Sequence, residues 1–306
     1  MATPRMALYA AGSNCWGQLD FQRSTETGFD LTRFTEVISA NEIERPKSGK
    51  VYSLARVDGR FLVAAHVRDQ ISISDVANVA FTANGNTILN GWHENFLTSE
   101  YFDAEGNSHS KIITLRKPAK QVVAYDTGFV ILYEDGVVAT MGDARFYAPL
   151  GRTPSPSTPA DEFADVDWPG DLDADPVKHI TACGWMVAAL TESGAVYLWG
   201  QDPPSLGGKG PTFVPGLSPE IGYAEIDGVQ DVADFALGET HAIALLCDGH
   251  VYVVGNNVNG QLGIPSIQST REWTRAQLLL PQGSRITGVA AGPNTSFILV
   301  SHGEAE

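Results

Sequence analysis

The sequence predicts an all-β protein in which short antiparallel hairpins close into a β-propeller. Three observations carry this prediction: a hairpin phrase that recurs along the second half of the chain, glycines and prolines spread over the sequence, and two chain ends that complete one another. The 31 glycines and 17 prolines are scattered among 306 residues, which favours many turns between short strands over a collagen-like or disordered segment. A chain of this length with 43% hydrophobic residues buries a substantial core.

The recurring phrase has the composition of a β-hairpin. Its clearest copy spans residues 232–263 and contains a β-rich run, the turn Asp248-Gly249, a second β-rich run and a final Gly-Gln-Leu-Gly loop. Further copies span residues 180–207, 122–151 and, less completely, 77–91. An Asp-Gly, Ser-Gly or Asn-Gly pair tolerates the positive φ angles of a two-residue hairpin turn. The nearly continuous apolar runs predict strands buried on both faces, as in sheets that stack face to face.

The two ends of the chain each hold half of a repeat. Residues 286–300 supply the first half, and residues 8–19 match residues 251–262 almost position for position. A blade begun at 286–300 and completed by residues 7–19 leaves no exposed sheet edge at the chain ends. We therefore predict a ring closed by the N- and C-terminal strands within one blade.

The number of blades can be estimated from the glycine that ends each inner hairpin. It stands at Gly12, Gly91, Gly142, Gly200 and Gly255. The first interval is too long for one blade, and residues 51–65 supply another strand, Asp-Gly turn and strand within it. The sequence therefore predicts about six blades, with five or seven as alternatives, in a single domain over residues 1–306 whose N-terminal third is degenerate. Residues 20–49, 93–110, 143–176 and 201–228 are predicted to be loops or outer strands.

Charge and cysteine content narrow the classes of partner. The formal net charge of −16 repels nucleic acid and anionic lipid and favours a basic protein partner. The three cysteines, Cys15, Cys183 and Cys247, lie far apart in the sequence, so we expect buried free thiols rather than disulfides or a thiol metal site. No signal segment and no long apolar run is recognisable. We expect a monomeric, cytoplasmic and possibly nuclear protein that contacts neither nucleic acid nor membrane directly.

No residue pattern points to catalysis, a metal or a cofactor. His241 follows a turn, and the matching position in the preceding blade is Trp185 or Met186, so we interpret His241 as a structural residue that bonds the backbone of a neighbouring blade. The remaining histidines lack metal-site spacing. Asp165 and Asp167 resemble the start of a calcium loop, but prolines occupy positions where ligands are needed. We therefore predict that the protein is not an enzyme.

Candidate contact residues lie in an acidic stretch and among the tryptophans. Residues 161–175 hold seven carboxylates, including Asp165, Asp167 and Asp171, and are predicted to form a solvated loop that docks a basic partner. The preceding residues 153–159 read as a flexible, phosphorylatable linker. Loop tryptophans anchor many protein interfaces, which makes Trp16, Trp92 and Trp168 further candidates. The alternative for these three side chains is ordinary packing between blades.

The phrase Gly238-x-x-His241, followed by Asp-Gly, Val-Tyr-x-x-Gly-x-Asn and Gly-Gln-Leu-Gly, resembles the repeat of the regulator of chromosome condensation (RCC1) family. The resemblance covers residues 122–300 and 7–19, and residues 34–120 only by inference. It implies a propeller that binds other proteins. Within the family the chain looks most similar to fungal alpha-tubulin suppressor proteins.

That likeness implies a non-catalytic regulatory or scaffold subunit that binds the small metalloprotein of diphthamide synthesis and supports wobble-uridine modification of tRNA. The alternative is a guanine nucleotide exchange factor for a Ran-like small GTPase, with residues 93–110 or 201–228 as the wedge it would need. A propeller enzyme is a third, weaker alternative, because the inner strands are rich in Ala, Val and Gly.

Overall fold

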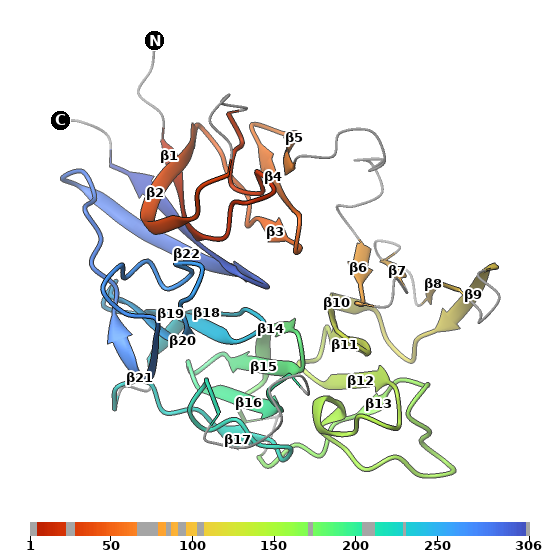
Figure 1. Ribbon diagram of the computed structural model, residues 1–306. Coiled ribbons are helices and arrows are strands. Elements are labelled where there is room, and N and C mark those ends of the chain that lie inside the picture. The colour runs from red at the N-terminus through yellow and green to blue at the C-terminus, as the bar shows by residue number, and fades with distance from the viewer. Residues whose placement is uncertain are drawn as a thin grey trace. The chain divides into compact units, whose positions relative to one another are not determined.

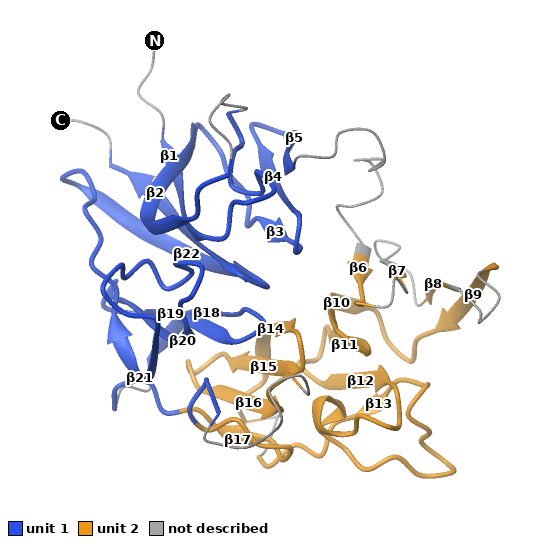
Figure 2. Cartoon of the chain, viewed as in Figure 1, with its two compact units in different colours: residues 1–70, 210–215, 225–306 blue, residues 71–209, 216–224 orange. Residues whose placement is uncertain are grey.

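The computed structural model describes residues 5–22, 28–65, 79–83, 87–90, 96–102, 107–170, 174–203, 212–228 and 231–303. The chain divides into two compact units (Figure 2): residues 1–70, 210–215 and 225–306 form unit 1, and residues 71–209 and 216–224 form unit 2. Figure 1 shows that the described part is built of β-strands joined by loops, with one short 3-10 helix among the described residues. None of its helical segments has the length and hydropathy to cross a membrane.

Unit 1 contains three sheets. Its terminal sheet has the order β2-β1-β23-β22, with strands Leu31–Ala40 (β2), Met6–Gly12 (β1), Thr295–His302 (β23) and Ser284–Gly292 (β22). A second sheet follows chain order through Val232–Leu237 (β18), His241–Leu246 (β19), Val251–Asn256 (β20) and Ser269–Arg275 (β21). The third holds Lys47–Ser48 (β3), Tyr52–Val57 (β4) and Arg60–Ala65 (β5).

Unit 2 also contains three sheets, each in chain order. The first holds Val79–Phe81 (β6), Thr87–Asn90 (β7), Phe96–Phe102 (β8) and Ser108–Thr114 (β9). The second holds Ala119–Tyr125 (β10), Gly128–Tyr133 (β11), Val138–Gly142 (β12) and Ala164–Asp165 (β13), with a short 3-10 helix at Ala148–Leu150 (η1). The third holds Val177–Cys183 (β14), Met186–Thr191 (β15), Val196–Gly200 (β16) and Gly222–Tyr223 (β17).

These sheets confirm the predicted six-bladed, all-β arrangement. Among the described residues five sheets have four antiparallel strands and the sheet β3-β4-β5 has three. The hairpin predicted over residues 51–65 is β4 and β5, and its turn Asp58-Gly59 has φ angles of 47° and 76°. Residues 20–49 and 93–110 were predicted to be loops or outer strands. The first range contains the outer strands β2 and β3, and the second contains β8, which pairs on both sides, and the start of the outer strand β9. A single domain over residues 1–306 stays a prediction.

The terminal sheet joins the two ends of the chain as predicted. β1 pairs antiparallel with β23 from Met6 opposite Ser301 to Gly12 opposite Thr295. Gly12 has a φ of 121°, and the glycines that end the equivalent strands, Gly200 and Gly255, have φ angles of 120° and 115°. A Cβ at any of the three would overlap a backbone carbonyl at the start of the neighbouring strand. Glycine is therefore required at this strand end by both conformation and space.

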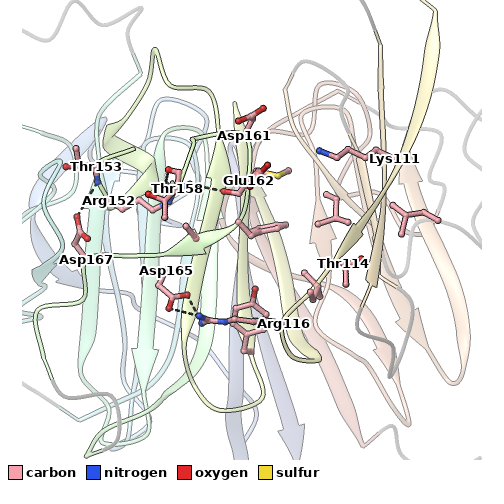
Figure 3. A pocket seen from close by; sticks show the side chains of 17 residues that line it. Lys111, Thr114, Arg116, Arg152, Thr153, Thr158, Asp161, Glu162, Asp165 and Asp167 are labelled. Carbon is pink, nitrogen blue, oxygen red and sulfur yellow. Dashed lines mark hydrogen bonds and ion pairs between the residues drawn. The ribbon is translucent and has the colours of Figure 1, made fainter. Parts of the chain in front are cut away.

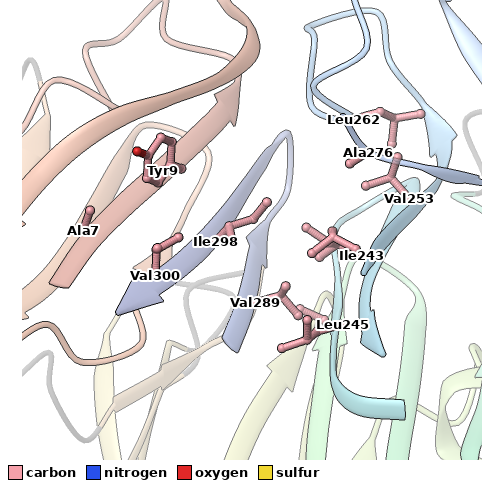
Figure 4. Packing of buried hydrophobic residues seen from close by; sticks show 12 residues of the cluster. Ala7, Tyr9, Ile243, Leu245, Val253, Leu262, Ala276, Val289, Ile298 and Val300 are labelled. Atoms are coloured by element: carbon pink, nitrogen blue, oxygen red, sulfur yellow. The ribbon is translucent and has the colours of Figure 1, made fainter. Parts of the chain in front are cut away.

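Hydrophobic residues fill the space between stacked sheets of unit 1. β19 and the first six residues of β23 are buried throughout. Alternate side chains of β23 point to opposite faces, so Ile298 and Val300 pack with Ile243 and Val253 of the second sheet (Figure 4). Phe297 and Leu299 join the cluster that contains Ala55 and Ala64 of the third sheet. Burial on both faces explains the continuous apolar runs in the sequence.

Polar side chains at β-bulges join neighbouring sheets within each unit. In unit 2, Gln121 at the bulge of β10 accepts a hydrogen bond from the Ile180 N–H (3.0 Å) and donates one to the Ile180 carbonyl (2.7 Å). In unit 1, Asp234 at the bulge of β18 accepts a hydrogen bond from the Val289 N–H (2.8 Å). In both strands the residue directly after the bulge satisfies a backbone group of the next sheet.

The cysteine prediction was wrong about burial. Cys15 and Cys247 are exposed, and Cys183 is partly exposed. Cys15 lies in the loop after β1, Cys247 lies in the turn between β19 and β20, and Cys183 ends β14. Turns and strand ends lie outside the packed layers, which explains why a small apolar residue is not buried there. All three cysteines are free thiols, as predicted.

Candidate protein-interaction site

A groove of about 640 Å³ in unit 2 contains two of the predicted contact residues (Figure 3). Residues 111–116, from the end of β9 and the segment after it, form one wall. Residues 161–167, around β13, form the other wall, and Tyr133 and Met141 contribute from β11 and β12. Two outer strands of neighbouring sheets therefore border the groove.

The pair Arg116–Asp165 links the two walls of the groove. The Arg116 guanidinium donates to Asp165 Oδ2 at 2.7 Å and approaches Oδ1 at 2.5 Å, and it lies 4.8 Å above the Tyr133 ring. Burial opposes the charge of Arg116, but the hydrogen bond and charge of Asp165 outweigh it and raise the pKa of Arg116. A bidentate guanidinium–carboxylate pair fixes geometry as well as charge, so the walls are held at a defined spacing.

Arg152 fixes the backbone of the acidic wall. It is 6% exposed and donates to the carbonyls of Thr140, Thr158, Pro159 and Glu162 at 2.8–3.2 Å. Burial lowers the pKa of Arg152, and its Nε has no hydrogen-bond partner. The Ser155 side chain also accepts a hydrogen bond from the Thr158 N–H. Residues 153–159 therefore form a structured turn, and the prediction of a flexible linker was wrong because the buried guanidinium binds their carbonyls.

The groove keeps an excess of exposed carboxylates. Asp161, Glu162 and Asp167 are exposed, and Asp167 Oδ2 accepts a hydrogen bond from the Thr153 N–H at 3.3 Å. Lys111 faces them from the opposite wall (Figure 3). Because Arg116 and Arg152 are engaged in the contacts described above, the accessible charge of the acidic wall is negative. Such a wall attracts lysine and arginine side chains of a partner.

The structure brings some of the predicted contact residues together and separates others. Asp165 and Asp167 line the groove, whereas Trp92 and Asp171 lie outside the described residues. Trp168 is half-buried and packs against Tyr197 with ring centroids 4.6 Å apart, as the packing alternative predicts. Trp16 is 49% exposed on a loop of unit 1. Partner binding by any of these residues stays a prediction.

Sequence reasoning missed the cationic residues of the groove. The dense basic run at residues 116–120 reads as an exposed strand end, yet its first residue pairs with the acidic loop. The basic run at residues 116–120 and the acidic stretch at residues 161–175 have opposite charge, and this was the signal from which their pairing could have been predicted. Arg152 gave no such signal, because its partners are backbone carbonyls rather than carboxylates.

His241 is buried and contacts the neighbouring sheet as predicted, but the hydrogen bond that its Nε2 makes is to the Ser296 side chain. Its Nε2 lies 2.9 Å from Ser296 Oγ of β23, in the neighbouring sheet, and its side chain is fully buried. Burial lowers its pKa to about 4, so the imidazole is neutral at physiological pH. A Cβ at Gly238 would overlap the His241 ring, which explains the motif Gly-x-x-His. In the described part of the chain no three His, Cys, Asp or Glu residues gather as a metal site would require.

Comparisons with known proteins identify the repeat. Residues 232–261 and 248–299 match the regulator of chromosome condensation (RCC1) repeat. The chain is 28% identical over 172 residues to the RCC1 domain-containing protein RUG3, mitochondrial, of Arabidopsis thaliana, covering 53% of this chain and 35% of that protein. It is 27% identical over 154 residues to a mouse RCC1-like G exchanging factor-like protein, covering 48% and 32%. The match thus spans about a third of each relative.

Solved structures share the fold at low sequence identity. Human WBSCR16 has a TM-score of 0.60 and 13% identity, covering 97% of this chain and 99% of that one. Prp20p of Saccharomyces cerevisiae, described with its binding properties to Gsp1p and histones, has a TM-score of 0.65 and 13% identity, covering 99% and 93%. At this identity the likeness establishes the fold. Residues 232–299 therefore carry the RCC1 repeat, and the likeness to the solved structures shows the fold of an RCC1-like β-propeller.

Proposed function

We propose that this chain is a non-catalytic regulatory or scaffold subunit that binds a basic segment of a partner protein in the groove of unit 2. The observation that carries the proposal is the acidic wall formed by Asp161, Glu162 and Asp167 beside a fixed Arg116–Asp165 pair. The wall is preorganised by Arg152, so a partner finds the carboxylates already in place. The accessible groups of the groove include no nucleophile paired with a base, which favours binding over catalysis.

The partner follows from the family resemblance rather than from the groove itself. Likeness to the fungal alpha-tubulin suppressor proteins points to the small metalloprotein of diphthamide synthesis, and through it to wobble-uridine modification of tRNA. The net charge of −16 supports a protein partner over direct contact with tRNA. We place this complex in the cytoplasm, with access to the nucleus.

Charge reversal in the groove tests the proposal. The purified diphthamide-pathway metalloprotein is titrated by calorimetry against the wild-type chain and against Asp161→Lys/Glu162→Lys. We expect the double variant to bind at least tenfold more weakly, with the loss concentrated at low salt. Glu192→Lys, an exposed acidic residue of the β15–β16 turn, is the matched control and leaves affinity unchanged. Equal binding by all three chains would remove the groove from the interface.

A second candidate function is nucleotide exchange on a Ran-like GTPase. The observation in its favour is the hairpin β8–β9, which carries exposed Phe96, Tyr101 and Ile112, with Ile112 68% exposed. A wedge that opens a nucleotide site needs such an apolar hairpin, and the Prp20p structure is described with binding to Gsp1p. Under this alternative, Tyr101→Ser/Ile112→Ser abolishes stimulated nucleotide release from the GTPase.

A further inference from the structure

Strand β9 has a partner on one side only. It ends the sheet β6-β7-β8-β9 and pairs antiparallel with β8, from Phe96 opposite Thr114 to Phe102 opposite Ser108. No described strand pairs with its other side. Alternate residues of a strand direct their N–H and C=O groups to opposite sides. Every second residue of β9 therefore presents a backbone donor and acceptor along an open edge, which is a template for another strand.

The groove of unit 2 runs along this open edge. Four consecutive residues of β9, at positions 111–114, line the groove. Because successive side chains of a strand point to opposite faces, consecutive residues share one groove where it follows the edge of the strand. The opposite wall contains β13, which among the described strands pairs only with β12. The groove therefore separates the outer strands of two neighbouring sheets (Figure 3).

The groove has room for one extended segment. Strands in a sheet lie about 4.8 Å apart, rise about 3.3 Å per residue and stack about 10 Å from the next sheet, so each residue takes up roughly 160 Å³. The groove volume of about 640 Å³ thus corresponds to about four strand residues, as many as β9 contributes to the wall. The Arg116–Asp165 pair spans the two walls beyond the end of β9 and keeps them apart.

Part of the groove lining is apolar. Ile113 of β9 and Phe163 of the opposite wall both line the groove, and both are half-buried. They pack against the same hydrophobic cluster, which includes Leu97 and Ile131. Side chains of one face of an added strand would meet these two residues, so we expect apolar residues at alternate positions of the segment.

The charges of the groove favour lysine or arginine at the other positions. Asp161 and Glu162 are exposed, and neither carboxylate forms a hydrogen bond or ion pair with another described residue. Lys111 is the exposed, unpaired cation of the opposite wall, because Arg116 is already paired and Arg152 is buried. Two free carboxylates therefore face one free ammonium. A second copy of the chain would bring a net charge of −16 to these carboxylates, which disfavours self-association.

We propose that the groove holds its partner by β-strand addition, in which an extended segment that alternates apolar residues with lysine or arginine pairs with the open edge of β9. This inference rests on the proposed function, because it states how the basic segment is bound. Backbone hydrogen bonds to β9 supply affinity, and the alternating side chains supply the choice of sequence. The apolar side chains contact Ile113 and Phe163, and the cationic ones lie beside Asp161 and Glu162.

A synthetic strand probe tests this inference without altering the chain. The probe is fluorescently labelled acetyl-Lys-Val-Lys-Val-Lys-Val-Lys-amide, and its control is the same peptide N-methylated at every residue. Both peptides have the same side chains and charge, but the control donates no backbone hydrogen bonds. Anisotropy titrations with the full chain should show at least tenfold tighter binding of the unmethylated probe. Added salt should weaken the binding of both peptides and leave the ratio of their affinities unchanged.

Hydrogen exchange of the chain locates the bound probe. The amides of residues 111–114 should gain protection with the unmethylated probe and not with the control. Equal affinity for both peptides, lost in Asp161→Lys/Glu162→Lys, would overturn strand addition and leave binding of a basic segment in the groove intact.

Three other outcomes would also overturn the inference: no binding of either peptide, protection confined to another outer strand such as β21, or a dimer of the chain, seen by light scattering, that the probe does not dissociate. The titration with the metalloprotein judges the proposed function separately. That protein can therefore fail to bind while the probe still reports strand addition.

Discussion

The turn between the first and second strands is built in opposite ways in two sheets. In the sheet β18–β21 the turn pairs Gly238 with His241, and the glycine leaves room for the buried imidazole. In the sheet β10–β13 the same position pairs Tyr125 with Gly128, and the large side chain precedes the glycine. The Tyr125 hydroxyl donates to the Met141 carbonyl (3.1 Å), whereas His241 reaches Ser296 of the next sheet.

In these two turns one bulky, hydrogen-bonded side chain lies over one glycine, and the order of the two residues is reversed. A search for Gly-x-x-His therefore finds the turn at Gly238 and His241 and misses the turn at Tyr125 and Gly128. The terminal sheet pairs Gly292 with Thr295 at this place, and the sheet β14–β17 pairs Cys183 with Met186.

The largest effect on the free energy of unfolding should come from adding a side chain at the two turn glycines. Gly238→Ala and Gly128→Ala should each lower the free energy of unfolding by more than about 3 kcal/mol, measured by urea denaturation. The first clash is with the His241 ring, so adding His241→Ser should recover part of the loss. The second includes the backbone carbonyl of Met141, so adding Tyr125→Ala should not recover it.

The control for these variants is Gly59→Ala, where no atom lies within 4 Å but φ is +76°. It should cost only about 1 kcal/mol, from backbone strain. Losses at Gly238 and Gly128 no larger than the loss at Gly59 would mean that close packing does not exclude a Cβ at these two turns, and the comparison between the turns would fail.

The buried histidine should make one of the two turns sensitive to acid. The pKa of His241 is about 4 in the folded chain, against 6.5 as its ordinary value, so the unfolded chain binds the additional proton between these pH values. The stability contributed by neutral His241 is therefore complete above pH 6.5 and is lost as pH falls toward 4, by roughly 3 kcal/mol. Tyr125 does not titrate in this range.

Stability measured as a function of pH in wild type and His241→Gln isolates this contribution, because all carboxylates remain in both chains. The difference between the two curves should shrink as pH falls from 6.5 to 4. A constant difference would contradict the burial of a neutral imidazole at this turn.

The hydrogen bonds of Asp234 and Gln121 join neighbouring sheets. Removing either should lower the free energy of unfolding by less than filling a glycine position does. Asp234→Ala should cost about 2 kcal/mol, because it leaves the buried Val289 N–H unpaired. Gln121→Ala should cost about 1 kcal/mol, because Gln121 is half-buried and water replaces part of its bonding to Ile180. Thermal unfolding of both variants checks the order, and a larger loss for Gln121→Ala would reverse our account of the two joints.

The smallest effect on stability should come from breaking the Arg116–Asp165 pair of the groove. Arg116 and Asp165 have side chains 46% and 47% exposed, so Arg116→Gln should change the free energy of unfolding by less than about 1 kcal/mol, and less still at high salt. Chemical denaturation at two salt concentrations measures this. A loss comparable to that of Asp234→Ala would make the pair a structural joint rather than part of a binding surface.

The sequence predicts the fold well because the repeat is recognisable from residues that lie close together in the sequence. Two-residue turns, strand-end glycines and the half repeats at residues 8–19 and 286–300 are all readable without knowledge of contacts, and each appears in the structure. The exchanged turn at Tyr125 and Gly128 was not readable, since its signal is a shape shared by two positions.

The candidate sites were less predictable than the fold. The acidic residues of the groove were found from composition, but the role of Arg152 depends on backbone carbonyls brought together by a turn. Asp30 hydrogen-bonds both the Asn14 N–H and Asn259 Nδ2, and no local sequence signal could show a bond between residues more than two hundred positions apart.

We propose that this propeller binds a partner without driving a reaction on it. The most direct measurement is the release of fluorescent GDP from a Ran-type GTPase with the chain added, alongside calorimetry of the chain with the diphthamide-pathway metalloprotein. We predict a stable complex with the metalloprotein and a GDP release rate unchanged by the chain. Accelerated GDP release that requires the hairpin β8–β9, with no metalloprotein complex, would contradict the claim and establish the exchange-factor alternative.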